Sequence, residues 1–231
     1  MNDRSEKVLL ITGASTGIGA ATARAAAAEG YRLALCARSE DKLRGLVDEL
    51  GAERVHAQPC DVTDFEAQQA MVQGVIDRFG RIDAVFANAG TGGEPGGFSG
   101  APVDSWQKMV EVNILGVAYT LRASLEALKQ QRGHVVLTGS VAGRRTLAGS
   151  MYSATKWAVS AIGYGLRAEL EGSGMRVTLI EPGMVDTPFF DRPKPDALRA
   201  EDVARTVLFA LGQPEHVDLH ELMVLPTPPT A

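Results

Sequence analysis

Tyr152 and Lys156 stand four residues apart in the segment YSATKWAVSAIGYGL, whose other residues are mostly small and apolar. At this spacing two side chains on a helix face the same way, which places the ammonium a few ångströms from the phenol. An unperturbed tyrosine has a pKa of about 10, and a nearby positive charge lowers it. The pair therefore predicts a tyrosine that acts as a general acid and base, with the lysine lowering its pKa.

Two further polar residues fit such a site. Ser140 ends a predicted strand, where its hydroxyl can orient a substrate oxygen, and Asn113 interrupts a long predicted helix with a side chain able to bond backbone or water. Each residue alone has an ordinary alternative: a surface Tyr/Lys pair, a turn serine or an exposed asparagine. Together, Asn113, Ser140, Tyr152 and Lys156 predict a catalytic segment spanning residues 113–156, in which Asn113 holds a water that relays protons to the lysine.

A glycine-rich turn at residues 12–19 follows the first predicted strand, with Gly13, Gly17 and Gly19 in the pattern G-x-x-x-G-x-G. Glycine permits a tight turn, close approach of backbone to a pyrophosphate and close packing of helix on strand, while the helix N-terminus offers free amides. A plain strand-to-helix turn is the alternative. Because the turn follows the first strand of an alternating chain, we expect a dinucleotide site.

The second predicted strand ends in CAR, about 20 residues beyond the turn, where a dinucleotide fold contacts the adenosine ribose. Ala37 and Arg38 stand where an acid would hold the free ribose hydroxyls of NAD. A guanidinium binds a phosphate through paired hydrogen bonds, so we expect NADP(H) to be preferred, with NAD(H) possible. A solvated loop arginine is the alternative. Asp61 can accept from the adenine amino group or simply begin a helix, and the NAG sequence at 88–90 ends the fourth strand.

The sequence also predicts the fold that positions these residues. Runs of apolar and β-branched residues indicate strands, and they alternate with segments long enough to form helices. The runs are KVLLIT, RLALCA, RVHAQP, DAVFAN, GHVVLTGS, MRVTLIEP and ELMVLP. The predicted fold is α/β: a single Rossmann-like domain over 1–231, with a doubly wound parallel sheet of about seven strands in the order 3-2-1-4-5-6-7 and helices on both faces. Thr63 and Glu66 predict a helix-capping box. A short, proline-broken substrate lid is expected at about 187–200, and PTPPTA should form an extended C-terminal end.

Composition narrows the function. The net charge is −5 without a Lys/Arg-rich stripe, which argues against nucleic-acid binding. No run resembles a membrane span, and the polar N-terminus leads straight into the first strand, so we expect a soluble, cytoplasmic protein that does not bind a membrane. Cys36 and Cys60 each end an apolar run rather than forming a close pair. We therefore expect reduced core thiols and no metal site.

Taken together, these motifs resemble the short-chain dehydrogenase/reductase family over nearly the whole chain: TGASTGIG, NAG, the four catalytic residues and EPGMVDT occur in the family's order. The resemblance implies that Pro182 and Gly183 shape the nicotinamide pocket and that Thr187 bonds the carboxamide. Arg38 matches the arginine of NADP(H)-preferring members. The closing ELMVLPT resembles a branch that acts on small hydroxy acids and related alcohols. The loop between the catalytic serine and tyrosine is slightly shorter than in many members.

The resemblance also implies a homodimer or homotetramer. The helices that carry Asn113 and Tyr152 would pair across a two-fold axis, and Gly163 and Gly165 would allow the close approach of another helix.

The expected contacts form two sets. The cofactor-binding residues are Gly13, Ser15, Thr16, Gly17, Ile18, Gly19, Arg38, Asp61, Val62, Asn88, Ala89, Gly90, Tyr152, Lys156, Pro182, Gly183, Val185 and Thr187. The substrate residues are Thr91, Val141, Arg144, Arg145, Met184, Phe189 and Phe190. One of the two arginines can bind a substrate carboxylate; the alternatives are solvated loop charges or contacts between subunits.

The function that follows is an NADP(H)-dependent oxidoreductase that interconverts a carbonyl and a secondary alcohol by hydride transfer, with Tyr152 as the general acid and base. Two alternatives remain open at this point: a non-catalytic protein that senses dinucleotides, and an enzyme that uses the same residues for a non-redox step such as epimerisation or elimination.

Overall fold

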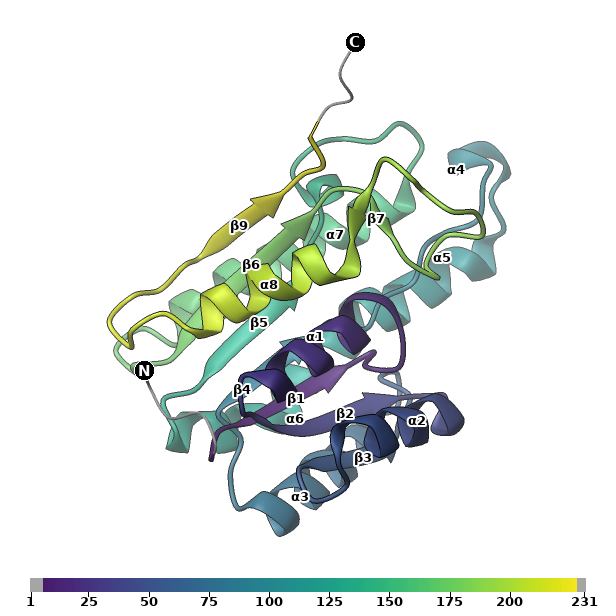
Figure 1. The fold of residues 1–231 in the computed structure, drawn as a ribbon. Coiled ribbons are helices and arrows are strands. Elements are labelled where there is room, and N and C mark those ends of the chain that lie inside the picture. Colours follow the sequence, from purple (N-terminus) through teal and green to yellow (C-terminus); the bar gives the residue numbers. More distant parts are fainter. Residues whose placement is uncertain (1–5, 228–231) are drawn as a thin grey trace.

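The computed structural model describes residues 6–227 and shows the predicted alternation of strands and helices (Figure 1). Within these residues a parallel sheet runs in the order β3-β2-β1-β4-β5-β6-β9. Its strands are β1 (Val8–Thr12), β2 (Arg32–Ala37), β3 (Val55–Pro59), β4 (Ala84–Ala87), β5 (His134–Thr138), β6 (Arg176–Pro182) and β9 (Glu221–Val224). The predicted order is confirmed, with β9 as the seventh strand of the sheet.

Helices cover both faces of this sheet. One face carries α1 (Gly17–Ala28), α2 (Glu40–Leu50) and α8 (Ala200–Leu211), and the other carries α3 (Phe65–Phe79), α6 (Gly116–Gln130) and α7 (Met151–Glu169). Successive strand residues point to opposite faces: Leu9 of β1 packs into the first core and Leu10 into the second. Burial on both faces explains why the strands are apolar along their whole length.

The shorter elements follow the carboxyl ends of the strands, where open α/β sheets bind ligands. They are α4 (Gly97–Gly100), α5 (Val103–Val110), the π-helical turn η1 (Glu111–Leu115), the 3₁₀ turn η2 (Val141–Gly143), and the two-residue strands β7 (Val185–Asp186) and β8 (Leu198–Arg199). η1 leads directly into α6. β7 and β8 pair with each other and thereby close the base of the predicted lid.

The start of α3 corrects one prediction. Thr63 and Glu66 do not form the capping box, because the helix begins one residue later, at Phe65. Asp64 caps it by accepting a hydrogen bond from the Ala67 amide (3.0 Å). The Thr63 hydroxyl is used elsewhere, since it donates to a carboxylate oxygen of Asp61 (2.9 Å).

Gly163 serves a different purpose from the one predicted. A Cβ at this position would lie 2.9 Å from the Leu179 side chain on β6, so the missing side chain lets α7 pack on the sheet rather than admitting another helix. Gly165 is exposed and has open space beside it. Most of the expected extended C-terminal end lies outside the described residues. No helix within 6–227 is long and apolar enough to cross a membrane.

Candidate active site

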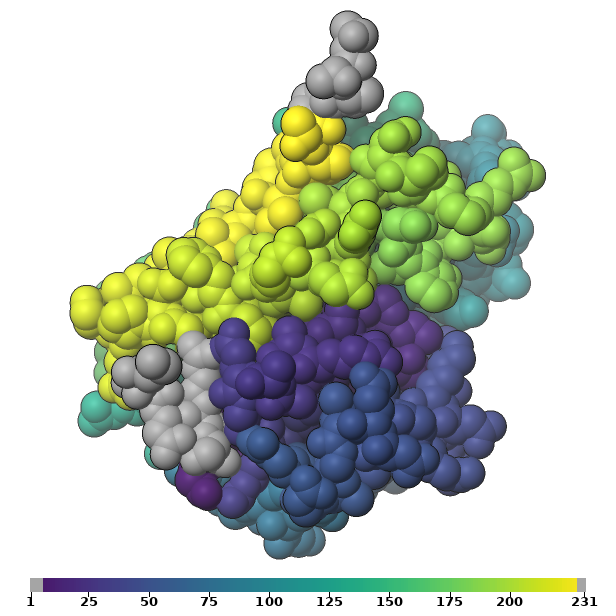
Figure 2. All heavy atoms as spheres, in the orientation of Figure 1, coloured from purple at the N-terminus to yellow at the C-terminus, as the bar shows by residue number. Residues whose placement is uncertain are grey.

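A cavity of about 500 Å³ opens where β1 to β6 end. The predicted cofactor residues that line it are Gly13, Ser15, Thr16, Gly17, Ile18, Arg38, Asp61, Val62, Asn88, Ala89, Gly90, Tyr152, Lys156, Pro182, Gly183, Val185 and Thr187. In Figure 2 the yellow-green segment around 185–199 lies against the purple turn that follows β1. This agrees with the close approach of Gly17 and Thr187, since a Cβ at the glycine would lie 3.2 Å from the threonine.

The glycine turn forms one end of the cavity. Gly13 has a φ of +65°, and a Cβ there would lie 2.9 Å from the Ala89 backbone. Gly19 does not line the cavity; a Cβ at that position would lie only 2.3 Å from the Gly13 carbonyl oxygen, so its role is packing of helix on turn. Thr16 precedes α1 without capping it through its side chain. The first amides of α1 are thus available to an anionic group such as a pyrophosphate.

Asn88 ties together the strand ends beneath this turn. Its side-chain amide donates to the Thr12 carbonyl (3.1 Å), and its side-chain oxygen accepts from the Thr138 hydroxyl (3.2 Å). The Asn88 backbone amide also donates to the Thr12 hydroxyl (3.1 Å). One side chain therefore fixes the ends of β1, β4 and β5 relative to one another, which makes the floor of the cavity rigid.

Two cations face the cavity beyond β2. Arg38 and Lys42 both line it and are exposed. Neither makes an ion pair within residues 6–227, because the neighbouring acids are already used: Arg44 pairs with Glu40 (3.1 Å) and with Asp41 (3.7 Å). The result is a positively charged pocket at this end of the cavity.

Tyr152 and Lys156 lie on the first turns of α7, on the same side, as their spacing predicted. The helix is capped by Ser150, whose hydroxyl accepts from the Ser153 amide (3.1 Å). The Lys156 Nζ atom lies 5.7 Å from the centre of the Tyr152 ring and donates to the Thr138 carbonyl (2.8 Å). Both side chains thus reach the cavity from one direction.

The Ser140 hydroxyl sits between β5 and this helix. It accepts a hydrogen bond from the Ala142 amide (3.1 Å) and so caps η2. It also donates to the Pro182 carbonyl (3.5 Å), and it lies close enough to the Tyr152 hydroxyl to lower the pKa of that phenol. These two hydroxyl groups are the ones that would contact a substrate oxygen.

Burial dominates the pKa values here. It lowers the pKa of Lys156 to about 8, because a charged amine that is only 4% exposed loses its hydration. Burial also raises the pKa of Tyr152, and the hydrogen bond with Ser140 only partly opposes this. The net pKa of Tyr152 therefore lies above its usual value because of burial, and the lowering of this pKa by Lys156 stays a prediction.

Asn113 lies behind the wall of the cavity rather than in it. It is 1% exposed and does not line the cavity. Its side-chain amide donates to the Thr91 carbonyl (2.9 Å) and to the Thr155 hydroxyl (3.1 Å), while its oxygen accepts from the Thr91 amide (2.8 Å). The side chain thus holds the loop after β4 against α7. The proton relay through a water held by Asn113 stays a prediction.

Comparison with known proteins agrees with this geometry. Residues 7–197 match the family described as short chain dehydrogenase. This chain belongs to the short-chain dehydrogenase/reductase family.

Its relatives cover nearly the whole chain. An uncharacterized oxidoreductase of Staphylococcus haemolyticus is 40% identical over 231 residues, which is 98% of this chain and 100% of that protein. An alcohol dehydrogenase from the archaeon Thermococcus sibiricus, solved in complex with 5-hydroxy-NADP, is 36% identical with a TM-score of 0.90 and covers 97% of this chain and 98% of its own. The serine dehydrogenase of Escherichia coli is 31% identical with a TM-score of 0.89, covering 97% and 100%.

The predicted substrate residues of this short-chain dehydrogenase fall into two groups. Thr91, Phe189 and Phe190 line the cavity, and the Phe189 ring lies 5.7 Å from that of Tyr152. The predicted residues that do not line it are Val141, Arg144, Arg145 and Met184. Arg144 cannot offer its guanidinium to a substrate, because it pairs with Glu181 (2.9 Å). It is not a solvated loop charge either, since its side chain is only 18% exposed.

Several lining residues were missed from the sequence, among them Ser39, Lys42, Cys60, Lys108, Val112, Thr138, Gly139 and Pro188. Lys42 had a detectable signal, because it stands four residues after Arg38 at the start of a helix. Within the part of the chain that the structure describes, no group of three or more His, Cys, Asp or Glu side chains is placed to hold a metal ion.

The prediction of reduced core thiols at Cys36 and Cys60 is confirmed, whereas their proximity in the fold was not predicted. Cys36 and Cys60 are buried free thiols, but they lie side by side at the ends of β2 and β3. The Cys36 thiol donates to the Cys60 carbonyl (3.9 Å), and a hydrogen bond from Cys36 lowers the pKa of the Cys60 thiol. The two residues are far apart in sequence, and only the pairing of neighbouring strands brings them together.

Proposed function

We propose that this short-chain dehydrogenase interconverts a carbonyl and a secondary alcohol with NADP(H), using Tyr152 as the general acid and base. The observation that carries the proposal is the convergence of Ser140, Tyr152 and Lys156 on one cavity, which also contains the glycine turn and a positively charged pocket. A dinucleotide would extend from that pocket to the tyrosine, and a small substrate would occupy the remaining space.

The residues at both ends of the cavity fit a phosphorylated dinucleotide. The first amides of α1 can donate hydrogen bonds to a pyrophosphate, and the absence of a side chain at Gly13 leaves room for it to approach the backbone. Arg38 and Lys42 suit a ribose 2′-phosphate, since both line the cavity without an acidic partner in the described residues. The archaeal relative that was solved with 5-hydroxy-NADP supports the same choice.

The mechanism assigns one task to each polar group. The nicotinamide of the bound cofactor supplies or accepts the hydride. Ser140 donates a hydrogen bond to the substrate oxygen and orients it, and Tyr152 gives that oxygen a proton in reduction or removes one in oxidation. Lys156, held by the Thr138 carbonyl, keeps a positive charge near the tyrosine. Phe189 covers the Tyr152 ring and limits the access of water.

The raised pKa of Tyr152 sets the direction of the pH dependence. Below its pKa the phenol carries the proton that carbonyl reduction requires. Alcohol oxidation requires the phenolate, whose population grows as the pH rises toward that pKa. We therefore expect the rate of oxidation to increase with pH through the alkaline range, while reduction stays fast at neutral pH.

The first test is a fluorescence titration with NADPH and, separately, NADH, on the wild type and on Arg38→Ala and Lys42→Ala. Each substitution should weaken NADPH binding about 10- to 100-fold, the range for loss of a hydrogen bond to a charged group, and leave NADH binding unchanged. Lys129→Ala is the matched control, because this exposed lysine of α6 pairs with Glu126 and does not line the cavity.

A second step tests turnover. With NADPH bound, a panel of aldehydes, ketones and keto acids should contain at least one carbonyl that the protein reduces. The proposal would be overturned if the protein bound neither nucleotide. The preference for NADP(H) would be overturned if Arg38→Ala and Lys42→Ala changed the ratio of NADPH to NADH affinity no more than Lys129→Ala does.

A further inference from the structure

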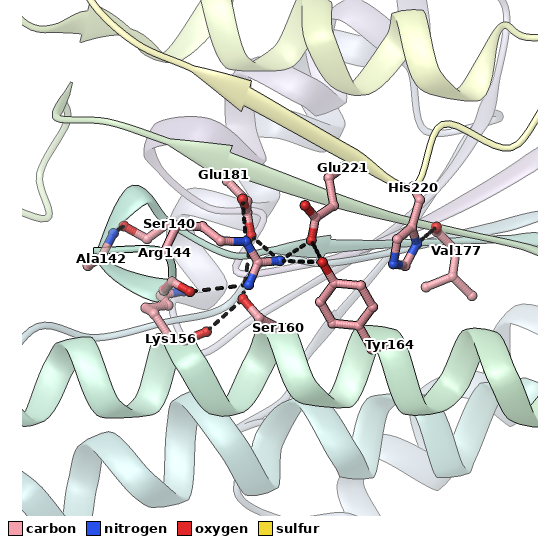
Figure 3. Close-up of polar contacts among 11 residues, drawn as sticks. Ser140, Ala142, Arg144, Lys156, Ser160, Tyr164, Val177, Glu181, His220 and Glu221 are labelled. Atoms are coloured by element: carbon pink, nitrogen blue, oxygen red, sulfur yellow. Dashed lines mark hydrogen bonds and ion pairs between the residues drawn. The ribbon is translucent and has the colours of Figure 1, made fainter. Parts of the chain in front are cut away.

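Arg144 directly follows the turn that begins at Ser140, and acidic side chains from two strands hold its guanidinium (Figure 3). Its Nε atom donates to Glu181 of β6 (3.1 Å) and its Nη2 atom pairs with the other oxygen of the same carboxylate (2.9 Å). The Nη2 atom also pairs with Glu221 of β9. Two parallel hydrogen bonds between a guanidinium and one carboxylate fix the orientation of the arginine as well as its distance from the acid. Here the pair is largely shielded from water, since Glu181 is 1% exposed.

The same cluster reaches α7, which runs along the group of side chains in Figure 3 and carries Lys156, Ser160 and Tyr164. The Ser160 hydroxyl bonds the Lys156 carbonyl (3.2 Å) and lies 3.4 Å from a Glu181 oxygen. The Tyr164 hydroxyl bonds Glu221, and the Arg144 guanidinium lies 5.3 Å from the centre of the tyrosine ring. The cluster therefore joins β6, β9 and the helix that carries Tyr152 and Lys156.

The segment from Ser140 to Arg144 fits closely against this helix. The Ser153 hydroxyl donates to the Ala142 carbonyl (2.6 Å), and a Cβ at Gly143 would lie 2.7 Å from the Lys156 carbonyl oxygen. The Ser140 hydroxyl fixes the start of the segment by capping it. The guanidinium fixes its end, so movement at Arg144 would be transmitted along one short turn to the hydroxyl.

We propose that Arg144 is a positioning residue: by holding the end of this turn on Glu181 and Glu221, it keeps the Ser140 hydroxyl aligned with Tyr152. It touches neither the cavity nor a substrate, and it acts through the serine alone. The inference rests on the proposed function, because alignment of these two hydroxyl groups matters for proton exchange with a substrate oxygen.

The test compares Arg144→Met, the double variant Arg144→Met/Glu181→Gln, and Arg167→Met. The single variant leaves a buried carboxylate without its partner and should lower the melting temperature. In the double variant the neutral glutamine removes that cost, so stability returns while the clamp stays absent. Arg167→Met is the matched control, since this exposed arginine of α7 pairs with Asp218 (3.0 Å) away from the turn.

We expect kcat to fall about 10- to 100-fold in both Arg144 variants, the cost of a misplaced catalytic group, with NADPH affinity at the wild-type level. The control should keep its kcat. A double variant that regains both its melting temperature and the wild-type kcat would show that Arg144 only supports the fold, and would overturn the inference. This variant decides the matter even where the single variant does not fold.

A second readout does not depend on turnover. The hydrogen bond with Ser140 lowers the pKa of Tyr152, so misalignment of the serine should raise it further. An alkaline titration of tyrosinate absorbance, taken as the difference between each protein and its Tyr152→Phe counterpart, measures this pKa. An unchanged value in the double variant would overturn the inference. A wild type that reduces no carbonyl would instead count against the proposed function, and the titration would still decide the role of Arg144.

Discussion

Replacing Lys156 with methionine should make the folded protein more stable while removing turnover. Burial lowers the pKa of this lysine from 10.5 to about 8. At about 1.4 kcal/mol per pKa unit, holding the charged amine in the fold at pH 7 costs about 3 kcal/mol. Methionine has a similar length without the charge, but it loses the hydrogen bond to the Thr138 carbonyl, worth about 1 kcal/mol. The net gain at pH 7 is therefore about 2 kcal/mol.

The sign of the pH dependence follows from the same numbers. The pKa of Lys156 is about 8 in the fold and 10.5 in the unfolded chain, so between these values the unfolded state binds the extra proton. Wild-type stability then rises with pH across this window, and about 2 kcal/mol of the penalty is gone by about pH 9.5. The advantage of the variant should shrink by the same amount and nearly vanish there.

Urea unfolding at pH 7 and pH 9.5, followed by tryptophan fluorescence, measures both quantities. Lys129→Met is the control, because Lys129 is an exposed residue of α6 and its loss should change stability little at either pH. A Lys156→Met protein less stable than the wild type at pH 7, or a difference that does not change with pH, would refute the reasoning that burial of a charge governs this residue.

Three further predictions follow from the site and the sheet. Tyr152→Phe should lower kcat about 10²- to 10⁴-fold with NADPH affinity unchanged, and wild-type turnover would contradict its role as acid and base. Gly19→Ala should weaken NADPH binding at least tenfold in fluorescence titration, because the new Cβ would lie 2.3 Å from a backbone oxygen of the cofactor turn; Gly45→Ala, on an open helix face, should bind normally. Burial lowers the pKa of His134 from 6.5 to about 3. As the pH falls, this residue therefore binds a proton in the unfolded chain at a higher pH than in the folded chain. Stability should therefore fall by about 2 kcal/mol between about pH 7 and pH 5 through this residue, and His134→Gln should flatten that slope in urea unfolding. An equal slope in both proteins would contradict it.

Much of the fold could be predicted because local patterns decide it. Strands buried on both faces must be apolar throughout, and their parallel direction follows from the alternation of strands with helices. The catalytic pair could be found for the same reason, since Tyr152 and Lys156 are neighbours on one helix and their spacing fixes their geometry.

What could not be predicted depends on contacts between distant segments. The sequence offered Arg144 as a substrate contact, a solvated loop charge or a contact between subunits, but its partners Glu181 and Glu221 come from two strands farther along the chain. Cys36 and Cys60 are brought together only by the pairing of β2 with β3. The net pKa of Tyr152 could not be predicted either, because a charge four residues away is visible in the sequence, whereas burial is a property of the folded chain.

The ladder of β7 and β8 has a consequence for how new specificities arise in this protein. Val185 pairs with Leu198 and Asp186 with Arg199. This pairing holds the two ends of the stretch between Asp186 and Leu198 next to each other at one place in the fold. The entropy of closing a flexible loop grows only with the logarithm of its length, and doubling it costs about 0.6 kcal/mol. Insertions and deletions between Asp186 and Leu198 can therefore reshape the walls around a substrate at almost no cost to the fold. Evolution, or a designer, can vary this stretch while the catalytic residues stay in place.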